Sequence, residues 1–376
     1  MSLFHAISCF IALYVIGRLI LPLSLPRSFK LVLGLIVLLG AEHQLITRNF
    51  FGSMASPEIP FALLVSLGWL YGAICFTGLL LICKDVVAAL ICVASRRIGT
   101  SLLQSVRLPV VIAIAAATLS LIGVWQAVRV PDVKKLEIVL PDLPAQLDGF
   151  RLVQLTDLHA SRLLQAPWMN AVVEKTNALQ PDLTVITGDL VDGTPEARQA
   201  DVQPLKRLQA RHGVYAIPGN HEYYADYASW LTAFHKLALP MLLNQSVTIT
   251  HQGASFVLAG VTDTIAPNFD QTPPDLKAAL RNAPANQPII LLAHRPIDAR
   301  ANAAAGVSLQ LSGHTHGGQI IGFHKIVQWG NQGFVSGLYQ VNAMQLYVSN
   351  GTGLWPGLPI RLGRPSEITE ITLRAR

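Results

Sequence analysis

Two histidines near the carboxyl end of the chain have a spacing that is found in metal sites. His314 and His316 lie in the stretch Ser-Gly-His-Thr-His-Gly-Gly-Gln, residues 312–319. The preceding run 307–311 alternates like a short strand, and the surrounding glycines permit a sharp turn, so we expect both imidazoles on a tight loop at the end of a strand. Such a pair alone is common in structural positions. It indicates a metal site only if further ligands occur upstream.

Further candidate ligands follow four other apolar runs. These runs, like 307–311, are short and rich in Val, Ile and Leu, as is typical of buried strands; they cover residues 150–156, 183–187, 214–217 and 289–293. The side chains that follow them and could bind a metal are Asp157 and His159, Asp189 and Asp192, Asn220 and His221, and His294.

Helical patterns lie between some of these runs, at 169–179 and 201–211. In folds that alternate strands and helices, the loops at the carboxyl ends of neighbouring strands converge on one site. We therefore expect the candidate ligands to meet at one edge of a sheet. Further strands are expected at 136–140, in a hairpin over 248–260, at 345–349 and at 367–373.

The mixture of carboxylate, imidazole and amide ligands suits Mn, Fe or Zn. One ion needs about four such groups, so the set is large enough for two. Two cations about 4 Å apart can clamp a phosphoryl group and lower the pKa of a bridging water, while a nearby histidine can protonate the leaving oxygen. Individually, Asp192 could cap a turn, Asn220 could hold a loop and His294 could be a buried structural imidazole. Together the residues favour a centre with two metal ions.

In order, the motifs are Asp-x-His, Gly-Asp-x-x-Asp, Gly-Asn-His-Glu, a lone His and Gly-His-x-His. This series resembles the calcineurin-like metallophosphoesterase superfamily, and the flanking sequence resembles its bacterial membrane-associated phosphodiesterase branch. The resemblance covers about residues 136–373. It implies an α/β fold, a four-layer αββα sandwich, and a metal-dependent phosphoric ester hydrolase with two divalent metal ions, Mn, Fe or Zn.

The resemblance also implies a role for each residue of the site. The first ion would be held by Asp157, His159 and His316. The second would be held by Asn220, His294 and His314, and the Asp189 carboxylate would bridge the two ions. His221 would approach the leaving group or a phosphoryl oxygen, oriented by Asp192. Gly193 stands where the protein phosphatase branch has a phosphate-binding arginine, which argues against a Ser/Thr phosphatase. Arg295 and Arg361 are candidates for binding the substrate phosphate, and either could instead be a surface or structural arginine.

The amino-terminal third of the chain has a different composition. Hydrophobic residues make up 51% of the 376 residues and charged residues only 13%, which is too apolar for an ordinary soluble protein. The excess lies in four stretches of about the length that crosses a bilayer, at residues 3–24, 29–47, 60–83 and 108–128. The first lacks a signal-peptide cleavage site. The shorter run 86–94 is expected to extend the third helix or to lie at the interface.

These features predict three parts of the chain: about four transmembrane helices over 1–130, a linker with the first strand over 131–149, and a catalytic domain over 150–376. Residues 1–130 hold nine Lys or Arg against three Asp or Glu, whereas the rest holds 19 of each. A globular part without net charge does not attract a polyanion, so we expect no nucleic-acid partner.

The positions of the cations predict the orientation in the membrane. The first and third loops are basic, whereas the second offers only Arg48 beside Glu58. The positive-inside rule then places the first and third loops in the cytoplasm and the catalytic domain on the extracytoplasmic side of a bacterial inner membrane. Arg129, Lys134 and Lys135, just after the last span, argue for the opposite orientation.

These inferences lead to one functional hypothesis and two alternatives. The hypothesis is a multi-pass membrane enzyme that cleaves a phosphodiester or pyrophosphate in a lipid or envelope component, using metal-activated hydroxide with His221 as acid or phosphate-orienting group. One alternative is a cytoplasmic-facing pyrophosphatase of a nucleotide-linked lipid precursor. The other is a catalytically silent binding scaffold. The sequence leaves the native substrate and the oligomeric state open.

An aromatic cluster follows the Asn-His motif at helical spacing and fits two interpretations. It comprises Tyr223, Tyr224, Tyr227 and Trp230. These side chains could pack in a core, or they could form an apolar rim where an acyl chain or the bilayer meets the site.

Overall fold

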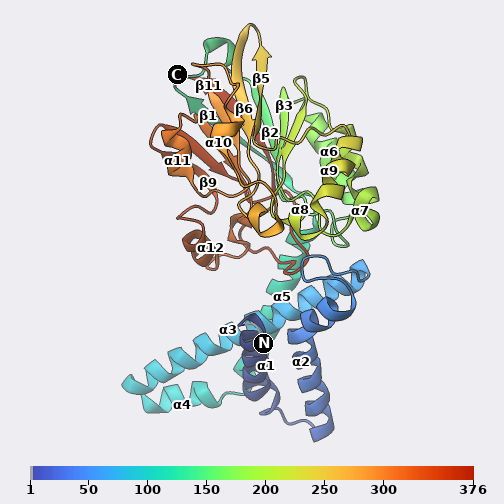
Figure 1. The fold of residues 1–376 in the computed structure, drawn as a ribbon. Helices are drawn as coiled ribbons and strands as arrows, with labels where there is room; N and C mark the ends of the chain where they lie inside the picture. The colour runs from blue at the N-terminus through green and yellow to red at the C-terminus, as the bar shows by residue number, and fades with distance from the viewer. Residues whose placement is uncertain (1–2) are drawn as a thin grey trace. The chain divides into compact units, whose positions relative to one another are not determined.

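Long apolar helices make up the amino-terminal part of the computed structural model, which describes residues 3–376 (Figure 1). They are α1 (Leu3–Val15) continued by the π-helical turn η1 (Ile16–Ile20), α2 (Arg27–Phe50), α3 (Phe61–Ala94), α4 (Arg96–Gln104) and α5 (Arg107–Val128). Four of these, with α1 and η1 taken together, are long and apolar enough to cross a membrane. The four predicted long apolar helices are thus confirmed, and residues 86–94 do extend the third helix.

An ion pair joins two of these helices. Arg18 donates from Nε and Nη2 to the carboxylate of Asp85, at 2.6 and 2.7 Å, and the Tyr14 hydroxyl donates to the same carboxylate at 2.5 Å. A charge in an apolar environment is costly unless it is paired. Asp85 therefore ties the α1–η1 segment to α3.

The chain forms two compact units. One comprises the residues up to Gln126 together with Gly357–Ile360, and the other comprises Ala127–Pro356 and Arg361–Arg376. Each unit is described separately below.

The second unit contains two β-sheets. The first has the strand order β1-β11-β2-β3-β4 and is made of β1 (Asp132–Leu140), β11 (Glu367–Ala375), β2 (Arg151–Leu155), β3 (Leu183–Thr187) and β4 (Val214–Ile217). The second has the order β5-β6-β7-β8-β10-β9 and is made of β5 (Gln245–His251), β6 (Ala254–Gly260), β7 (Ile289–Leu292), β8 (Leu309–Ser312), β10 (Met344–Val348) and β9 (Gly337–Val341).

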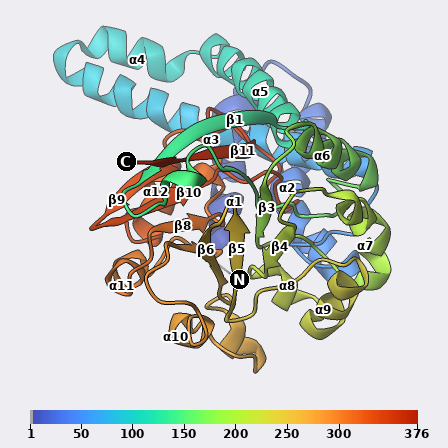
Figure 2. The ribbon, with the colours of Figure 1, turned by 90° about the horizontal axis from the view of Figure 1, so that it is seen from above.

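Helices cover the outer faces of both sheets (Figure 2). Those against the first sheet are α6 (Ala166–Ala178), α7 (Pro195–Val202) and α9 (Tyr227–Lys236), and those against the second are α10 (Leu276–Ala279) and α11 (Ala299–Ala304). The side chains of β2 show why both faces of the sheet are covered, because successive residues of a strand point to opposite faces. Leu152 points into the core between the sheets, while Val153 and Leu155 pack against the helices. The four-layer αββα sandwich predicted from the sequence is confirmed.

Several boundaries differ from the prediction. The helix predicted over 201–211 is wrong. Helix α7 ends at Val202, a 3-10 turn covers Gln203–Arg207, and the next four residues are not helical. Pro204 explains the change, because a proline has no N–H to continue an α-helix. Strand β9 and the short helices α8 (His221–Tyr224) and α12 (His324–Gly330) were not predicted.

The strand register brings several loops to one edge of the sandwich. Strand β1 pairs in parallel with β11, Asp132 opposite Glu367, and β11 pairs antiparallel with β2, Thr369 opposite Gln154. Strands β2, β3 and β4 are parallel to one another. The carboxyl ends of β2, β3 and β4 therefore lie at the edge where β1 and β11 begin.

Candidate metal centre

The structure brings all seven predicted ligands together at that edge. They follow β2, β3, β4, β7 and β8 and are Asp157 and His159, Asp189, Asn220, His294, and His314 and His316. All are buried except His314, which is half-buried. Two sheets thus contribute to a single cluster of carboxylate, amide and imidazole groups.

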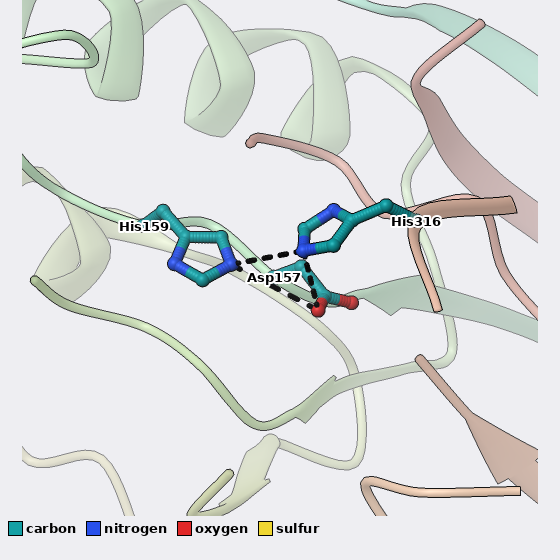
Figure 3. A group of neighbouring side chains, drawn as sticks. All are labelled: Asp157, His159 and His316. Atoms are coloured by element: carbon teal, nitrogen blue, oxygen red, sulfur yellow. Dashed lines mark hydrogen bonds and ion pairs between the residues drawn. The ribbon is translucent and has the colours of Figure 1, made fainter. Parts of the chain in front are cut away.

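Asp157, His159 and His316 form the first group of side chains (Figure 3). The Nε2 atoms of the two imidazoles are 3.3 Å apart, and the Asp157 Oδ1 atom lies 3.5 Å from that of His316 and 3.9 Å from that of His159. All three side chains point toward one another. One cation would fit between these three atoms.

A second group is arranged around the Asp189 carboxylate. Asp189, His294 and His314 each offer an atom within 4.8 Å of the others. The Asp189 Oδ2 atom lies 3.2 Å from His294 Nε2, which is itself 3.2 Å from the Asn220 Oδ1 atom. The same Oδ2 atom is 3.7 Å from His159 Nε2 in the first group. Asp189 therefore lies between the two groups, as a bridging ligand must.

Bonds outside the centre orient the imidazoles. The Nδ1 atom of His159 lies 3.1 Å from the Asp192 Oδ2 atom, and that of His294 donates to the Thr187 carbonyl at 2.8 Å. Each bond fixes the ring and leaves Nε2 facing the centre, as is usual for metal-binding histidines.

The electrostatics of the cluster favour positive charge. Burial by itself would lower the pKa of His294, but the facing Asp189 raises it to about 10. Burial would likewise raise the pKa of Asp189, but His294 and His221 outweigh it and hold that pKa well below its usual range. Burial and neighbouring positive charges lower the pKa values of His314 and His316, so both rings are neutral electron-pair donors. This donor set fits two divalent cations.

The backbone at these ligands is unusual. Asp157, His159, Asp189, His314 and His316 have φ values of 53°, 47°, 53°, 68° and 50°, a left-handed region that residues other than glycine seldom adopt. Local bonds hold it in place: the His314 N–H donates to both carboxylate oxygens of Asp157 at 3.1 Å, and the His221 N–H donates to Asp189 Oδ1 at 2.9 Å. Such backbone conformations cluster at functional sites.

His221 and Asp192 form the predicted pair beside the ligands. The Asp192 carboxylate bonds the Nδ1 atoms of both His221 and His159. Burial by itself would lower the pKa of His221, but the carboxylates of Asp189 and Asp192 raise it to about 9. The same carboxylates thus favour the protonated form of His221, whose Nε2 atom lies 4.0 Å from Asp189 Oδ2.

The two candidate arginines have different surroundings. Arg361 is completely buried, and its guanidinium donates to the carbonyls of His316, Asn350 and Gly353 at 3.0, 2.7 and 2.9 Å. Its side chain thus holds the loop that carries a ligand. Arg295 is partly exposed, pairs with the Asp263 carboxylate at 3.0 Å, and places Nη1 3.2 Å from His314 Nε2. Of the two, only Arg295 borders the centre from a solvent-accessible side.

Glu222 is a buried positioning residue that sequence reasoning missed. Its Oε2 atom accepts from the N–H groups of Gly219 and Asp189 at 2.6 and 3.2 Å, and its Oε1 atom accepts from Leu190 at 2.6 Å. One carboxylate therefore joins the loops after β3 and β4. The signal was present in the Gly-Asn-His-Glu motif, but the role works through backbone groups that a sequence does not place.

The aromatic cluster divides between core and rim. Tyr223 and Trp230 are buried at 2% and 0% exposure, so these two belong to the core. Tyr224 is 49% exposed, and its ring centroid lies 5.1 Å from that of His221. Trp355 lies 6.5 Å from His221, and Phe269 lies 6.0 Å from Tyr224. An apolar rim thus adjoins the predicted catalytic histidine.

Comparison with known proteins identifies relatives over this part of the chain. Residues 150–318 match the family model described as calcineurin-like phosphoesterase. A bovine transmembrane protein with metallophosphoesterase domain is 36% identical over 71% of this chain and 62% of its own length. Uncharacterised metallophosphoesterases of Helicobacter pylori and Bacillus subtilis are 37% and 33% identical, over 67% and 62% of this chain and 66% and 82% of their own lengths. The chain spans less than two thirds of the bovine and Helicobacter relatives.

Replacement of Glu222 by glutamine tests its positioning role. The amide keeps the shape but puts an NH2 group against backbone donors, so the loops that carry Asp189 and Asn220 should shift. Loss of a supporting partner typically costs about 10- to 100-fold in metal affinity, and we expect a loss in that range. Manganese titration of the purified full-length protein measures it, with exposed Glu196→Gln as the matched control. Equal affinity in the Glu222→Gln and control variants would contradict the role.

Proposed function

Because the chain belongs to the calcineurin-like phosphoesterase family, we propose that it is a membrane-anchored phosphoesterase that uses two divalent metal ions. The proposed substrate is a phosphodiester or pyrophosphate in a lipid or envelope component. The four apolar helices and the bovine transmembrane relative support membrane anchoring.

One observation carries the proposal. Five strand ends from two sheets direct carboxylate oxygens and imidazole nitrogens into a single buried cluster, with Asp189 between two groups of ligands. A packed core has no reason to collect such groups, because burying them without a partner is unfavourable. A catalytically silent scaffold would have no need to keep all seven ligands in this arrangement.

The residues of the centre divide into three roles in this proposal. Two divalent cations, when bound, would supply the positive charge that activates water and neutralises phosphoryl oxygens. His221 would donate a proton to the leaving oxygen, since the Asp192 carboxylate bonded to its ring raises its pKa and favours the protonated form. Asp192 would hold the Nδ1 side of His221, so that Nε2 faces the centre. Arg295 would contact a phosphate oxygen beside His314.

The surroundings of the centre favour an ester with an apolar group. Tyr224 and Trp355 lie beside His221, the proposed acid, and Phe269 lies beside Tyr224. Large aromatic side chains favour contact with acyl chains or other apolar groups. The rim therefore supports a lipid substrate over a small soluble phosphate ester.

Removal of single ligands tests the two-metal centre. Asp189→Asn weakens both predicted ion positions and His314→Ala removes a ligand of one, so we expect either change to reduce hydrolysis of bis(p-nitrophenyl) phosphate with added Mn²⁺. The loss should be at least about 100-fold, because even the loss of a residue that only supports a metal ligand costs up to about 100-fold in activity. Exposed His235→Ala and Asp270→Asn serve as matched controls. Activity that survives the ligand changes at control levels would refute the metal assignment.

The pair His221 and Asp192 can be separated by two readouts. His221→Ala should lower kcat by about 10²- to 10⁴-fold, the usual contribution of a positioned acid, while the metal content stays close to that of the unmodified chain. Asp192→Asn should lower both kcat and metal content, because Asp192 also holds the ligand His159. Elemental analysis beside steady-state kinetics measures the two effects. If His221→Ala emptied the centre of metal, His221 would be a ligand instead of an acid.

The proposed orientation places the catalytic domain outside the cytoplasm. Two reporter enzymes are fused after Leu136, one active only in the periplasm and one active only in the cytoplasm. The first should be active and the second silent, because the basic first and third loops remain inside. A fusion after Arg97, in the third loop, should give the opposite pattern and is the internal control. A cytoplasmic signal at Leu136 would instead support the cytoplasmic-facing pyrophosphatase.

A further inference from the structure

An exposed apolar segment follows directly after the ligand His316. Ile321, Phe323, Ile326 and Trp329 are 68%, 47%, 61% and 86% exposed. Phe323 is the residue just before α12, and Ile326 and Trp329 lie within this helix. The three are spaced three residues apart, so they share one side of the helix. We call these four residues the apolar segment. Exposed apolar groups of this size, side by side, usually mark a surface that contacts a partner.

The apolar segment is firmly joined to the metal loop. The Ile321 N–H donates to the Leu362 carbonyl at 2.9 Å, and the Leu362 N–H donates to the Gln319 carbonyl at 2.9 Å. Gly318 packs so closely on His324 that a side chain at position 318 would collide with the His324 backbone. Whatever binds the apolar segment is therefore held close to His316.

Chain connectivity limits the distance between this edge and the membrane. Only residues 129–131 separate the end of α5, a candidate span, from the start of β1, and an extended connection of that length reaches at most about 14 Å. Strand β1 begins at the same edge of the sandwich as the ligand loops after β2 and β3. The edge that carries the metal centre is thus the edge at which the chain arrives from the candidate span α5.

The composition of the segment fits a bilayer surface. Residues 319–338 contain Lys325 and no Asp or Glu, so nothing in this stretch repels anionic headgroups. Tryptophan prefers the membrane interface, and a lysine beside apolar residues can keep its ammonium among the headgroups. Amphipathic helices that carry Trp, Phe and aliphatic residues on one face lie in the interfacial plane of membranes.

From these observations we propose that Ile321, Phe323, Ile326 and Trp329 dock into the surface of the lipid bilayer and hold the metal centre at the headgroup level. The contact does not depend on catalysis. Its consequence rests on the proposed function: the centre would act on phosphoesters presented in the plane of the membrane, and soluble esters would lack the same access.

Site-specific fluorescence tests the contact in the full-length protein. The four cysteines, Cys9, Cys75, Cys83 and Cys92, are replaced by serine, and single cysteines at Trp329 or Ile326 carry an environment-sensitive dye. The matched control is Val139→Cys, a position of β1 that is 45% exposed and about 23 Å from Asp132 along the strand. The protein is placed in phosphatidylcholine–phosphatidylglycerol nanodiscs whose acyl chains carry nitroxide quenchers.

The dyes at 326 and 329 should lose most of their fluorescence in nitroxide discs, whereas the dye at 139 should not. Equal quenching at all three positions would overturn the proposal. Shielding from an aqueous quencher without quenching by nitroxide lipid would also overturn it, since a protein surface, such as a second copy of this chain, would then cover the segment. Quenching is measured without turnover, so an inactive enzyme does not affect this result.

A second variant guards against effects of the labels themselves. A dye at Ile321→Cys should be quenched by nitroxide lipid, and the added changes Ile326→Glu and Trp329→Glu should abolish that quenching because carboxylates resist insertion. Both side chains are mostly exposed, so the changes leave the core intact, and thermal unfolding checks this. Quenching at 321 that persisted in the double variant would contradict docking by the apolar segment.

Discussion

The Asp189 carboxylate is the group on which the rest of the site depends. It is buried among His159, His221 and His294, and it accepts the N–H of His221. A carboxylate in such a place is tolerated only if positive charge or several donors face it. The surrounding imidazoles and the backbone N–H of His221 serve that requirement, whereas the Glu222 carboxylate acts on the backbone of the loop by accepting the Asp189 N–H. A divalent cation on each side of Asp189 would satisfy it most completely.

The sandwich makes this cluster possible because its two sheets meet at one edge. Gln154 illustrates the connection: its Nε2 atom donates to Thr187 Oγ1 in the first sheet and to the Ser312 carbonyl in the second, at 2.9 and 3.1 Å. The apolar core behind it is built from both sheets. The ligands therefore sit on strand ends that packing fixes, with only short loops between strand and side chain. A site built in this way loses little conformational entropy when an ion binds.

The strand ends and the candidate ligands could be predicted from the sequence for a simple reason. Buried strands require short runs of Val, Ile and Leu, and a polar residue directly after such a run, as at Asp157 or His294, is conspicuous. The role of Glu222 could not be predicted, because its partners are backbone N–H groups on two loops that are distant in sequence. Arg361 is a candidate for phosphate binding in the sequence for a similar reason: the sequence does not show that four carbonyls accept from its guanidinium. The helix predicted over 201–211 is wrong because Pro204 interrupts a stretch whose apolar periodicity is helical.

The direction of β1 has a consequence for which substrates can reach the centre. Because β1 and β11 are parallel, the strand nearest the anchor and the last strand both begin at the edge of the ligand loops. The other end of β1, at Leu140, lies about 30 Å from that edge along the strand, the length of a nine-residue strand. At that distance from a centre, a lipid would have to leave the bilayer to be cleaved, at a cost of about 0.8 kcal/mol for each CH₂ group exposed to water. In the proposed lipid phosphoesterase, the short connection between α5 and β1 and the orientation of β1 would avoid this cost.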